Sequence, residues 1–337
     1  MIYFIVQDWQ NTHGNHAGMV HLCNEIKKLA TTEVKVFVIP NVRIKNRDIR
    51  ILQNILYVMV AILLIFRVKN GSKVFLMEYL LPTHNQYFIV KFLRIFKTVK
   101  LYGLAHLVPS DLNQYYAGNY ERLISWIKPL DKILTLGTSL SKFLMGKGIS
   151  NNKICTLFHY VDLDYYRIEN IPPRVQTKML KVIIMGSMKR DIKTIENIMN
   201  RVSNVHFIYC CGKKKIDKSI FKHPQNITLC GFVPEEELKA LMNESDISLN
   251  VMIDTIGSNV ITTSLAMGLA MVVSDVGSIR DYCNASNAIF CQSEDDFIEA
   301  IKLLTNKREK LDSMKTASGH IAQKFSVSNF YNEIQNI

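Results

Sequence analysis

Apolar runs and helix-type patterns alternate along most of this chain. In the N-terminal half, each short apolar run reads as a strand, and the segment that follows it usually shows the period of a helix. The expected strands of this half cover residues 2–9, 33–39, 72–79, 98–106, 131–137 and 152–160. Strands that alternate with helices predict an α/β fold, in which helices cover both faces of a parallel sheet.

The C-terminal half repeats this alternation. Its expected strands cover residues 181–187, 205–212, 226–233, 246–252, 270–278 and 287–291. Its expected helices cover residues 191–202, 234–245, 259–268 and 294–307. A repeated pattern in a chain of 337 residues predicts two domains, because a single core rarely grows to that size.

Residues 167–180 contain a pair of prolines and no clear periodicity, which is typical of a linker. We therefore expect two Rossmann-like, doubly wound domains over residues 1–166 and 181–325, facing a central cleft. A short helix over residues 326–337 is expected to pack back onto the first domain.

The charge of the chain is unevenly distributed. The net charge is +12, and residues 1–170 hold 21 Lys and Arg against 11 Asp and Glu. Such an excess indicates an anionic partner or surface. Nucleic acid is not expected, because the chain has no helix-turn-helix or zinc-finger pattern. The seven cysteines lack metal-ligand spacing, so we expect reduced thiols. Met1 opens directly into an apolar strand, which favours a cytoplasmic protein.

Two segments of the basic half have the composition of membrane-associated helices. The first, residues 51–69, has an apolar core over residues 55–66, shorter than the roughly 20 residues that span a bilayer. It is expected to be a buried or interfacial helix. In the second, residues 87–100, Lys91, Arg94 and Lys97 recur between apolar positions. This is either a domain helix with a solvated basic face or a helix that lies on anionic lipid, and the excess charge favours lipid on the inner face of the membrane.

A third pattern, in the C-terminal half, is typical of an anion site. A helix begins near Ser258 and Asn259 with no acidic residue in its first turns, so its free amides would attract an anion. An earlier strand ends at Gly186 and is followed by Lys189, Arg190 and Lys193, a set that suits a diphosphate or forms a solvated face. At a third strand end, Phe232 and Val233 would receive a flat base or pack in the core.

The N-terminal half places polar groups after three of its strands. Gly14 and Gly18 would allow close approach of a ligand to the first loop, where His16 could make a polar contact. Glu78 and His106 each follow a later strand. All of these positions fall at the carboxyl ends of strands, where ligands bind in doubly wound sheets.

Taken together, the motifs resemble those of retaining GT-B glycosyltransferases of family 4. The resemblance is carried by "GSMKRDIKTI", by "ITLCGFVPEEELKALMNESDISLNV" and by "SNVITTSLAMGLAMVVSDVGSIRDY", and the N-terminal half adds "LDKILTLGTSLSKFLMGKGISNNKICTLFHYVDLDYYR". It implies a nucleotide-diphosphate sugar as donor, no cofactor besides this co-substrate, and a reaction without a metal. It assigns donor binding to Gly14, His16, Gly18, Gly186, Lys189, Arg190, Lys193, Phe232, Val233, Ser258, Asn259, Val260, Thr262 and Thr263. It assigns a contact with the donor sugar to His106. We expect His106, Asp254 and Glu78 to be the catalytic residues, Glu78 because it lies at a strand end.

The chain departs from the family pattern at two positions. The family usually carries two glutamates eight positions apart, for the donor sugar and the ribose, where this chain has Thr255 and Thr263. Asp254 could take over the sugar contact. The departure leaves open a nucleotide-sugar-binding homologue without activity, and a nucleotide-sugar epimerase is a further alternative. An inverting reaction, with Glu78, His106 or Asp111 as general base, also stays open.

The excess positive charge suggests the class of acceptor. A basic face at the inner leaflet would reach a lipid-linked oligosaccharide or glycolipid. We therefore expect a role in the synthesis of a surface polysaccharide such as capsule or lipopolysaccharide.

Overall fold

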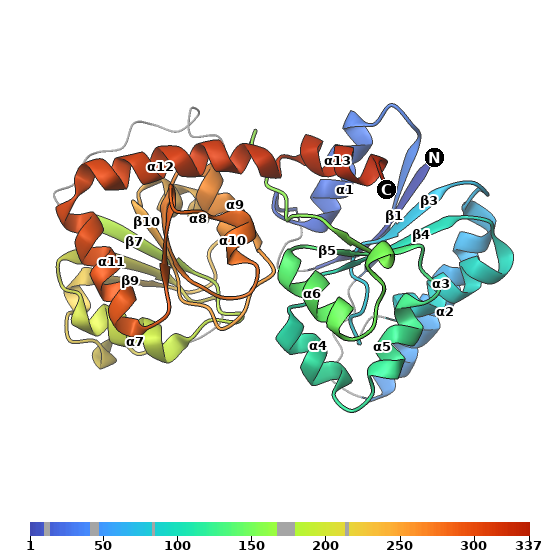
Figure 1. The fold of residues 1–337 in the computed structure, drawn as a ribbon, viewed down its shortest axis with the longest axis horizontal. Helices are drawn as coiled ribbons and strands as arrows, with labels where there is room; N and C mark the ends of the chain where they lie inside the picture. The colour runs from blue at the N-terminus through green and yellow to red at the C-terminus, as the bar shows by residue number, and fades with distance from the viewer. Residues whose placement is uncertain (10–13, 41–46, 83–84, 167–178, 213–215) are drawn as a thin grey trace. The chain divides into compact units, whose positions relative to one another are not determined.

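The computed structural model describes residues 1–9, 14–40, 47–82, 85–166, 179–212 and 216–337. The chain forms two compact units (Figure 1). Unit 1 consists of Met1–Phe158 together with Val327–Ile337, and unit 2 is His159–Ser326. Most of the expected linker, residues 167–178, lies outside the described residues.

Unit 1 is built on a six-stranded parallel sheet in the order β2-β1-β3-β4-β5-β6. Its strands are β1 (Ile2–Asp8), β2 (Val34–Pro40), β3 (Lys73–Leu76), β4 (Lys100–Ala105), β5 (Lys132–Thr135) and β6 (Ile154–Thr156). Four successive residues of β1, Tyr3 to Val6, are fully buried. Since successive side chains point to opposite faces, both faces of this sheet are covered, as the apolar runs predicted.

Helices cover the two faces of this sheet. They are α1 (Met19–Leu29), α2 (Arg47–Arg67), α3 (Gln86–Phe96), α4 (Pro109–Tyr116), α5 (Tyr120–Ile127), α6 (Thr138–Gly146) and α13 (Val327–Gln335), with a 3₁₀ turn, η1, at Asn151–Lys153. The helices α4 and α5 were not expected, because eight residues are too few to show a clear helical period. The last helix, α13, packs against α1. Lys73 donates to the carbonyl of Gln335 at 2.8 Å, and the Tyr102 hydroxyl donates to that of Ile337 at 3.0 Å.

Unit 2 holds the second six-stranded parallel sheet, in the order β12-β11-β10-β7-β8-β9. Its strands are β7 (Leu180–Met185), β8 (Val205–Cys210), β9 (Ile227–Cys230), β10 (Ile247–Asn250), β11 (Ala270–Ser274) and β12 (Ala288–Cys291). Its helices are α7 (Ile192–Arg201), α8 (Glu235–Asn243), α9 (Asn259–Ala266), α10 (Ile279–Tyr282), α11 (Glu294–Asn306) and α12 (Arg308–Ala322), with 3₁₀ turns η3 (Lys218–Ile220), η4 (Pro224–Asn226) and η5 (Gln323–Phe325).

The helix α12 was not predicted from the sequence. It buries Leu311 and Met314 in the core of unit 2, and the hydroxyl of Ser318 donates to the carbonyl of Leu269 at 2.7 Å. Only a narrow stripe of α12 is apolar, which explains why its pattern was weak.

Each sheet has one point where the direction of strand addition reverses. In unit 1 this switch point lies between β1 and β3, and in unit 2 it lies between β7 and β10. Loops that leave neighbouring strands there diverge to opposite faces and leave room for a ligand at the carboxyl ends. We therefore expect functional groups near these two switch points.

Arg94 and Asp131 join α3 to the central strands of unit 1. The Arg94 guanidinium donates to the carbonyls of Pro129 (2.6 Å) and Val99 (3.0 Å) and pairs with the Asp131 carboxylate. That carboxylate also accepts from the amide of Leu101 at 2.7 Å. The guanidinium of Arg94 is thus used within unit 1, so this predicted membrane contact has a structural role.

We expect Asp131→Asn to destabilise the protein in a pH-dependent way. Burial opposes ionisation of Asp131, but hydrogen bonds from Leu101 and Arg94 and the charges of Arg94 and Lys100 lower its pKa overall. A carboxyl with a lowered pKa stabilises the fold at neutral pH, and this contribution is lost as the pH falls through the folded pKa. The free energy of unfolding should drop by about 1–2 kcal/mol at pH 7, measured by urea melts.

The difference between variant and parent should be smaller at the lowest pH at which the parent still folds than at pH 7, because the contribution is lost as the pH falls through the lowered pKa of Asp131. A gap of equal size at both pH values would contradict an ionic contribution. Glu299→Gln is the matched control, because Glu299 pairs only across an exposed helical turn with Lys302. It should change stability by less than about 0.5 kcal/mol.

Candidate functional site

Two loops meet at the switch point of unit 2. One joins β7 to α7 over residues 186–191, and the other joins β10 to α9 over residues 251–258. The amide of Ile253 donates to the carbonyl of Lys189 at 3.1 Å, and the amide of Asp191 donates to that of Val251 at 3.1 Å. Arg190 and Met252 form an antiparallel bridge between the same loops. The loops therefore form one unit of structure.

Lys189 has a left-handed backbone with φ of 53°. This conformation costs a non-glycine residue roughly 1–2 kcal/mol, and here the pairing of the two loops holds it in place. The left-handed turn lets the chain reverse between β7 and α7. Backbone strain of this kind is concentrated at functional sites.

Arg190 places a partly buried cation beside this turn. Its Nε donates to the carbonyl of Met185 at 3.2 Å, and burial lowers the pKa of its guanidinium to about 10. A Cβ at Gly186 would lie 3.9 Å from both Arg190 Nη2 and Val260 Cγ2, so the guanidinium and the first turn of α9 meet at this glycine. Within the described part of the chain, no carboxylate forms an ion pair with Arg190. A partly desolvated cation of this kind favours an anionic ligand.

The N-terminus of α9 adds a second attraction for an anion. The helix has no acidic residue in its first turn, and the buried hydroxyl of its N-cap, Ser258, has no hydrogen-bond partner among the residues that the structure describes. The partial positive charge of the helix end is therefore not neutralised by a carboxylate in its first turn. The Ile261 amide, in the first turn of α9, donates to the carbonyl of Ser258 at 3.0 Å, so it is already used within the helix.

The start of α7 is different, because Asp191 caps it. The Asp191 carboxylate accepts from the amide of Thr194 at 3.1 Å and from its hydroxyl at 2.8 Å. An acidic cap already satisfies this helix end. Lys193, in the first turn of α7, is exposed. The start of α9, with the Arg190 guanidinium near its first turn, is therefore the better candidate for an anion position.

Three threonine hydroxyls are used inside unit 2. Thr262 is fully buried and donates to the carbonyl of Tyr160 at 3.1 Å, and Thr263 donates to that of Asn259 at 2.5 Å. The hydroxyl of Thr255 accepts from the amide of Gly257 at 3.1 Å. The structure thus gives the predicted ligands Thr262 and Thr263 a role in holding α9.

Two glycines allow the β10–α9 loop to pack closely. A Cβ at Gly277, where φ is 56°, would lie 2.1 Å from the carbonyl oxygen of Thr255 and 2.9 Å from Asp254 Oδ1. A Cβ at Gly257 would lie 2.1 Å from the ring of Tyr282. These contacts fix the loop that carries Asp254, so the backbone needs glycine at both positions.

The end of β9 presents an exposed aromatic ring. Phe232 is 60% exposed, and Val233 beside it is half-buried. Of the two interpretations of the sequence, core packing of Phe232 is therefore wrong. An exposed ring at the carboxyl end of a strand is available to stack on a flat base.

The switch point of unit 1 holds a buried carboxyl group, that of Glu78. Glu78 is 1% exposed, and its Oε2 accepts from the amide of Gln7 at 3.0 Å. The side-chain oxygen of Gln7 in turn accepts from the Tyr57 hydroxyl at 2.7 Å. Burial raises the pKa of Glu78 to about 8, against the lowering effect of hydrogen bonds from Gln7, Gln86 and Trp9.

At neutral pH the Glu78 carboxyl is therefore mostly protonated. It is also covered by the protein, so the structure does not present it to a substrate as a general base. The catalytic role predicted for Glu78 is replaced by a structural one, in which it ties β1, β3 and α3 together at the switch point.

The remaining predicted residues of unit 1 lie on loops after strands. His106 follows β4 and is half-buried. Gly14 is exposed with φ of 75°, and Gly18 is the buried N-cap of α1. The ring of His16 packs against that of His21, with centroids 4.8 Å apart.

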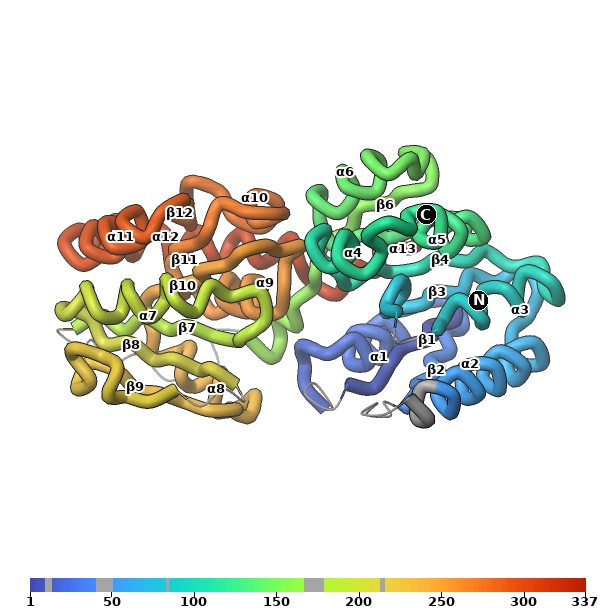
Figure 2. Tube along the Cα trace, turned by 90° about the horizontal axis from the view of Figure 1, so that it is seen from below, coloured from blue at the N-terminus to red at the C-terminus, as the bar shows by residue number. Residues whose placement is uncertain are grey.

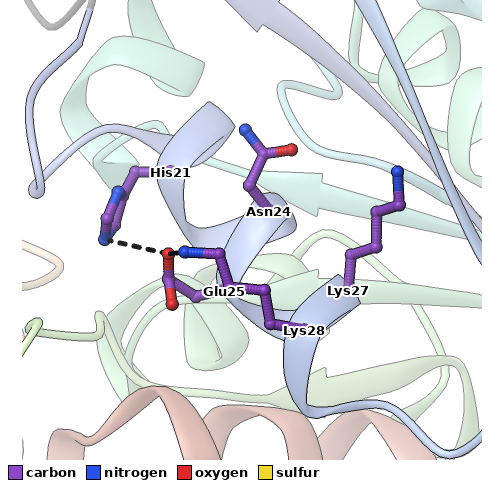
Figure 3. A pocket seen from close by; sticks show the side chains of 5 residues that line it. All are labelled: His21, Asn24, Glu25, Lys27 and Lys28. Atoms are coloured by element: carbon purple, nitrogen blue, oxygen red, sulfur yellow. Dashed lines mark hydrogen bonds and ion pairs between the residues drawn. The ribbon is translucent and has the colours of Figure 1, made fainter.

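A hollow of about 560 Å³ lies on the surface of α1 (Figure 3). It is lined by His21, Asn24, Glu25, Lys27 and Lys28. Lys28 Nζ lies 2.6 Å from the Glu25 carboxylate, and His21 Nε2 lies 4.0 Å from it. None of the predicted site residues lines this hollow, and we assign it no role in the site.

Replacing the buried carboxyl, in Glu78→Gln, should stabilise the protein at alkaline pH. A carboxyl whose pKa is raised by folding binds its proton more tightly in the native state, so its contribution to stability falls as the pH rises from about 4.5 to about 8. Glutamine keeps the shape without this titration. Relative to the parent, the variant should gain roughly 2–4 kcal/mol in free energy of unfolding between pH 5 and pH 8. Glu33→Gln, at an exposed pair with Lys35, should show no such gain. Parallel pH profiles of the Glu78 variant and the parent would refute the assignment.

The alanine substitution Gly277→Ala should disrupt the loop of Asp254. Its methyl group would overlap the Thr255 backbone, which cannot move without breaking the loop pairing. We expect a loss of about 3 kcal/mol or more in thermal or urea melts. Gly319→Ala in α12 is the control, because nothing lies within 4 Å of its added Cβ, and it should stabilise the helix by about 0.5–1 kcal/mol. Equal stability of the two variants would show that the loop tolerates a side chain.

Comparisons with known proteins agree with this geometry. Residues 165–307, which include both loops of the unit 2 switch point, match the family Glycosyl transferases group 1. The chain has no match among curated proteins. Among solved structures, it is similar to a glycosyltransferase from Rickettsia africae (13% identity, 99% of this chain and 96% of that chain covered, TM-score 0.72).

Two further structures show the same likeness over the full length. The lipopolysaccharide outer core galactosyltransferase WaaB is 12% identical, with 99% of this chain and 98% of that chain covered and a TM-score of 0.73. HepE from Anabaena, in complex with UDP and glucose, is 12% identical, with 100% and 99% covered and a TM-score of 0.72. The chain therefore has the two-domain α/β fold of GT-B glycosyltransferases, and its C-terminal unit carries the match to group 1.

Proposed function

We propose that this protein is a glycosyltransferase that takes a sugar from a nucleotide-diphosphate donor bound at the switch point of unit 2. The observation that carries the proposal is the partly buried Arg190 guanidinium, which has no carboxylate partner among the described residues and lies beside the uncapped N-terminus of α9. A diphosphate would supply the missing negative charge. The match to group 1 and the likeness to HepE, which was solved with UDP and with UDP-glucose, support a donor of this class.

The same groups would assist departure of the diphosphate. Arg190 and the α9 amides are fixed in place before the reaction, so they stabilise developing charge on the leaving phosphate without reorganisation. Lys189 and Lys193 add positive charge around this position, and the Ser258 hydroxyl would donate to a phosphate oxygen. With these groups in place, the reaction needs no metal.

The remaining contacts of the donor follow from the loops. Phe232 would stack on the base, and Asp254 would accept from a hydroxyl of the sugar. We expect retention of the anomeric configuration, with the acceptor hydroxyl attacking from the face of the leaving group and giving its proton to the phosphate. His106 would contact the donor sugar.

A lipid-linked oligosaccharide or a glycolipid is the proposed acceptor, in the synthesis of a surface polysaccharide at the inner face of the membrane. The excess of basic residues within residues 1–170 supports this choice, because lipid-linked diphosphates and membrane surfaces are anionic. The likeness to a lipopolysaccharide galactosyltransferase agrees with it.

A second candidate function is binding of a nucleotide sugar without transfer. It is favoured by the hydroxyls of Thr255 and Thr263, which are both used within unit 2 at the positions where the resembled family carries glutamates. Such a protein would hold the diphosphate but would lack the charged contacts to ribose and sugar. Binding and turnover must therefore be measured separately.

The first experiment compares donor binding in two arginine variants. Arg190→Ala should weaken binding of UDP and of the best nucleotide sugar by about 10- to 100-fold in calorimetric titration, because it removes charged hydrogen bonds to the diphosphate. Arg201→Ala is the control, since Arg201 lies at the far end of α7 and pairs with Glu294 and Asp295. Equal affinities of the Arg190 variant and the parent would remove the diphosphate assignment.

A second experiment measures turnover of a panel of UDP-, GDP- and dTDP-sugars, with and without glycolipid acceptors. It separates a glycosyltransferase from a protein that only binds nucleotide sugars. Sugar transfer supports the glycosyltransferase. Tight binding with neither transfer nor hydrolysis for any donor and acceptor pair would favour the binding protein.

A further inference from the structure

The helix α2 has two apolar faces, and only one of them is covered by the protein. Its buried face includes Gln53, Tyr57, Ala61 and Leu64. Its solvent face consists of large apolar side chains that are each at least 44% exposed: Ile51, Leu52, Ile55, Met59, Ile62, Leu63 and Phe66. At about 100° per residue, these seven positions fall within an arc of roughly 120° on the side opposite the buried residues. A surface helix normally carries polar residues there.

The helix α3 lies beside α2 and extends this surface (Figures 1 and 2). At one end, the side chain of Asn85, just before α3, bonds to that of Asn54 in α2. At the other end, Gly71 donates to the carbonyl of Thr98 at 2.7 Å. Contacts at both ends show that the two helices run side by side in the same direction.

Two more exposed apolar residues end α3. Ile95 is 72% exposed and Phe96 is 57% exposed. Together with the seven residues of α2, they form what we call the α2–α3 apolar face. Nine large exposed apolar residues on two helices that contact each other are typical of a binding surface.

The segment of sequence that carries the α2–α3 apolar face is rich in basic residues. Residues 51–100 hold seven Lys and Arg and a single acidic residue, Glu78, which is buried. Lys69, just after α2, and Lys91, within α3, are exposed, and Lys97 is half-buried at the end of α3. Arg94 forms an ion pair with Asp131, so we do not include it among the basic residues available to a partner.

The dimensions of α2 fit a helix that lies along a membrane. The uncharged stretch from Ile51 to Phe66 rises about 24 Å, against a hydrocarbon thickness of about 30 Å. Its buried side is also fixed to unit 1, for example by the hydrogen bond from Tyr57 to Gln7. Over the described residues, no helix has the length and hydropathy of a membrane span.

We propose that the α2–α3 apolar face docks unit 1 on an anionic lipid bilayer, with its apolar side chains among the acyl chains and with Lys69 and Lys91 at the headgroups. Amphipathic surfaces with basic rims bind anionic bilayers in this way. A second copy of the chain is a poorer occupant, because a symmetric pair would bring two basic rims together. The inference rests on the proposed function only in giving a lipid-linked acceptor its location, and the docking itself is argued from unit 1 alone.

The test measures binding of the full chain to vesicles of phosphatidylcholine with and without 30% phosphatidylglycerol. The parent should sediment with the anionic vesicles and remain in solution with the neutral ones. The triple variant Ile55→Ser, Met59→Ser, Phe66→Ser should bind at least about 100-fold more weakly, because it removes three apolar contacts. The control Leu29→Ser, Met145→Ser, Ile220→Ser removes three exposed apolar residues elsewhere and should bind like the parent.

Charge and insertion are tested independently. Lys69→Glu together with Lys91→Glu should reduce binding to anionic vesicles by about 10-fold or more, since each basic residue near the surface contributes about 1 kcal/mol. Phe66→Trp should show a blue shift of its fluorescence and quenching by brominated lipid. Tyr115→Trp, at an exposed position of α4, should show neither.

Several results would overturn the proposal. They are sedimentation of the serine triple variant at parental levels, absence of parental binding to any vesicle, and a parental dimer that becomes monomeric in the triple variant without lipid binding. UDP binding, measured on the same variants, depends on unit 2 and should not change. Loss of vesicle binding with intact donor binding therefore separates this inference from the proposed function.

Discussion

A partly buried positive charge, that of Arg190, organises the candidate site, and no carboxylate of the described residues forms an ion pair with it. Burial lowers the pKa of Arg190, and the backbone around it is fixed by the pairing of Lys189 with Ile253 and of Arg190 with Met252. Nearly every other feature of the loops supports this arrangement. Gly277 and Gly257 let the β10–α9 loop pack closely, and the threonine hydroxyls of α9 hold the helix start in place. A site fixed in this way needs little reorganisation when an anion binds.

The two switch points show how one architecture supports two kinds of polar group. In unit 2 the polar group is a cation that lies near the surface beside a helix end. In unit 1 it is the Glu78 carboxyl, which is covered by α2 and α3 and held largely neutral at pH 7. Burial disfavours the charged form of the Glu78 carboxyl. The switch point of unit 1 is therefore used for packing, whereas that of unit 2 is the candidate ligand site.

Unit 1 uses α2 in two ways. Its inner face completes the core and reaches Glu78 through Tyr57 and Gln7, while its outer face remains apolar in solvent. Ordinary folding gives no reason to keep seven large apolar side chains exposed, since each would be more stable away from water. The proposed lipid surface would supply that reason, and it would give the basic half of the chain a partner of opposite charge.

The sequence by itself determined the fold class, the two domains and the order of the strands, although several expected strands extend two to four residues past the carboxyl ends that the structure shows. Apolar runs with strand length are local features, and parallel sheets bury both faces of each strand, so the pattern of Ile2–Asp8 or Leu180–Met185 could be read directly. It also located the Gly186–Arg190 stretch and the start of α9. The sequence did not predict α4 and α5, because eight residues are too few to show a clear helical period. It did not predict α12, because only a narrow stripe of this helix is apolar.

Only the tertiary structure decided what the side chains near those strand ends do. Glu78 and Thr262 have the chemistry of site residues, but burial and hydrogen bonds to distant backbone give them structural roles. Arg94 follows the same rule, because its partner Asp131 lies 37 positions away in the sequence. Phe232 shows the opposite case, an apolar residue left exposed. The reason is physical: periodicity reports which side of an element a residue occupies, whereas solvent access and hydrogen-bond partners depend on segments that meet only when the chain folds.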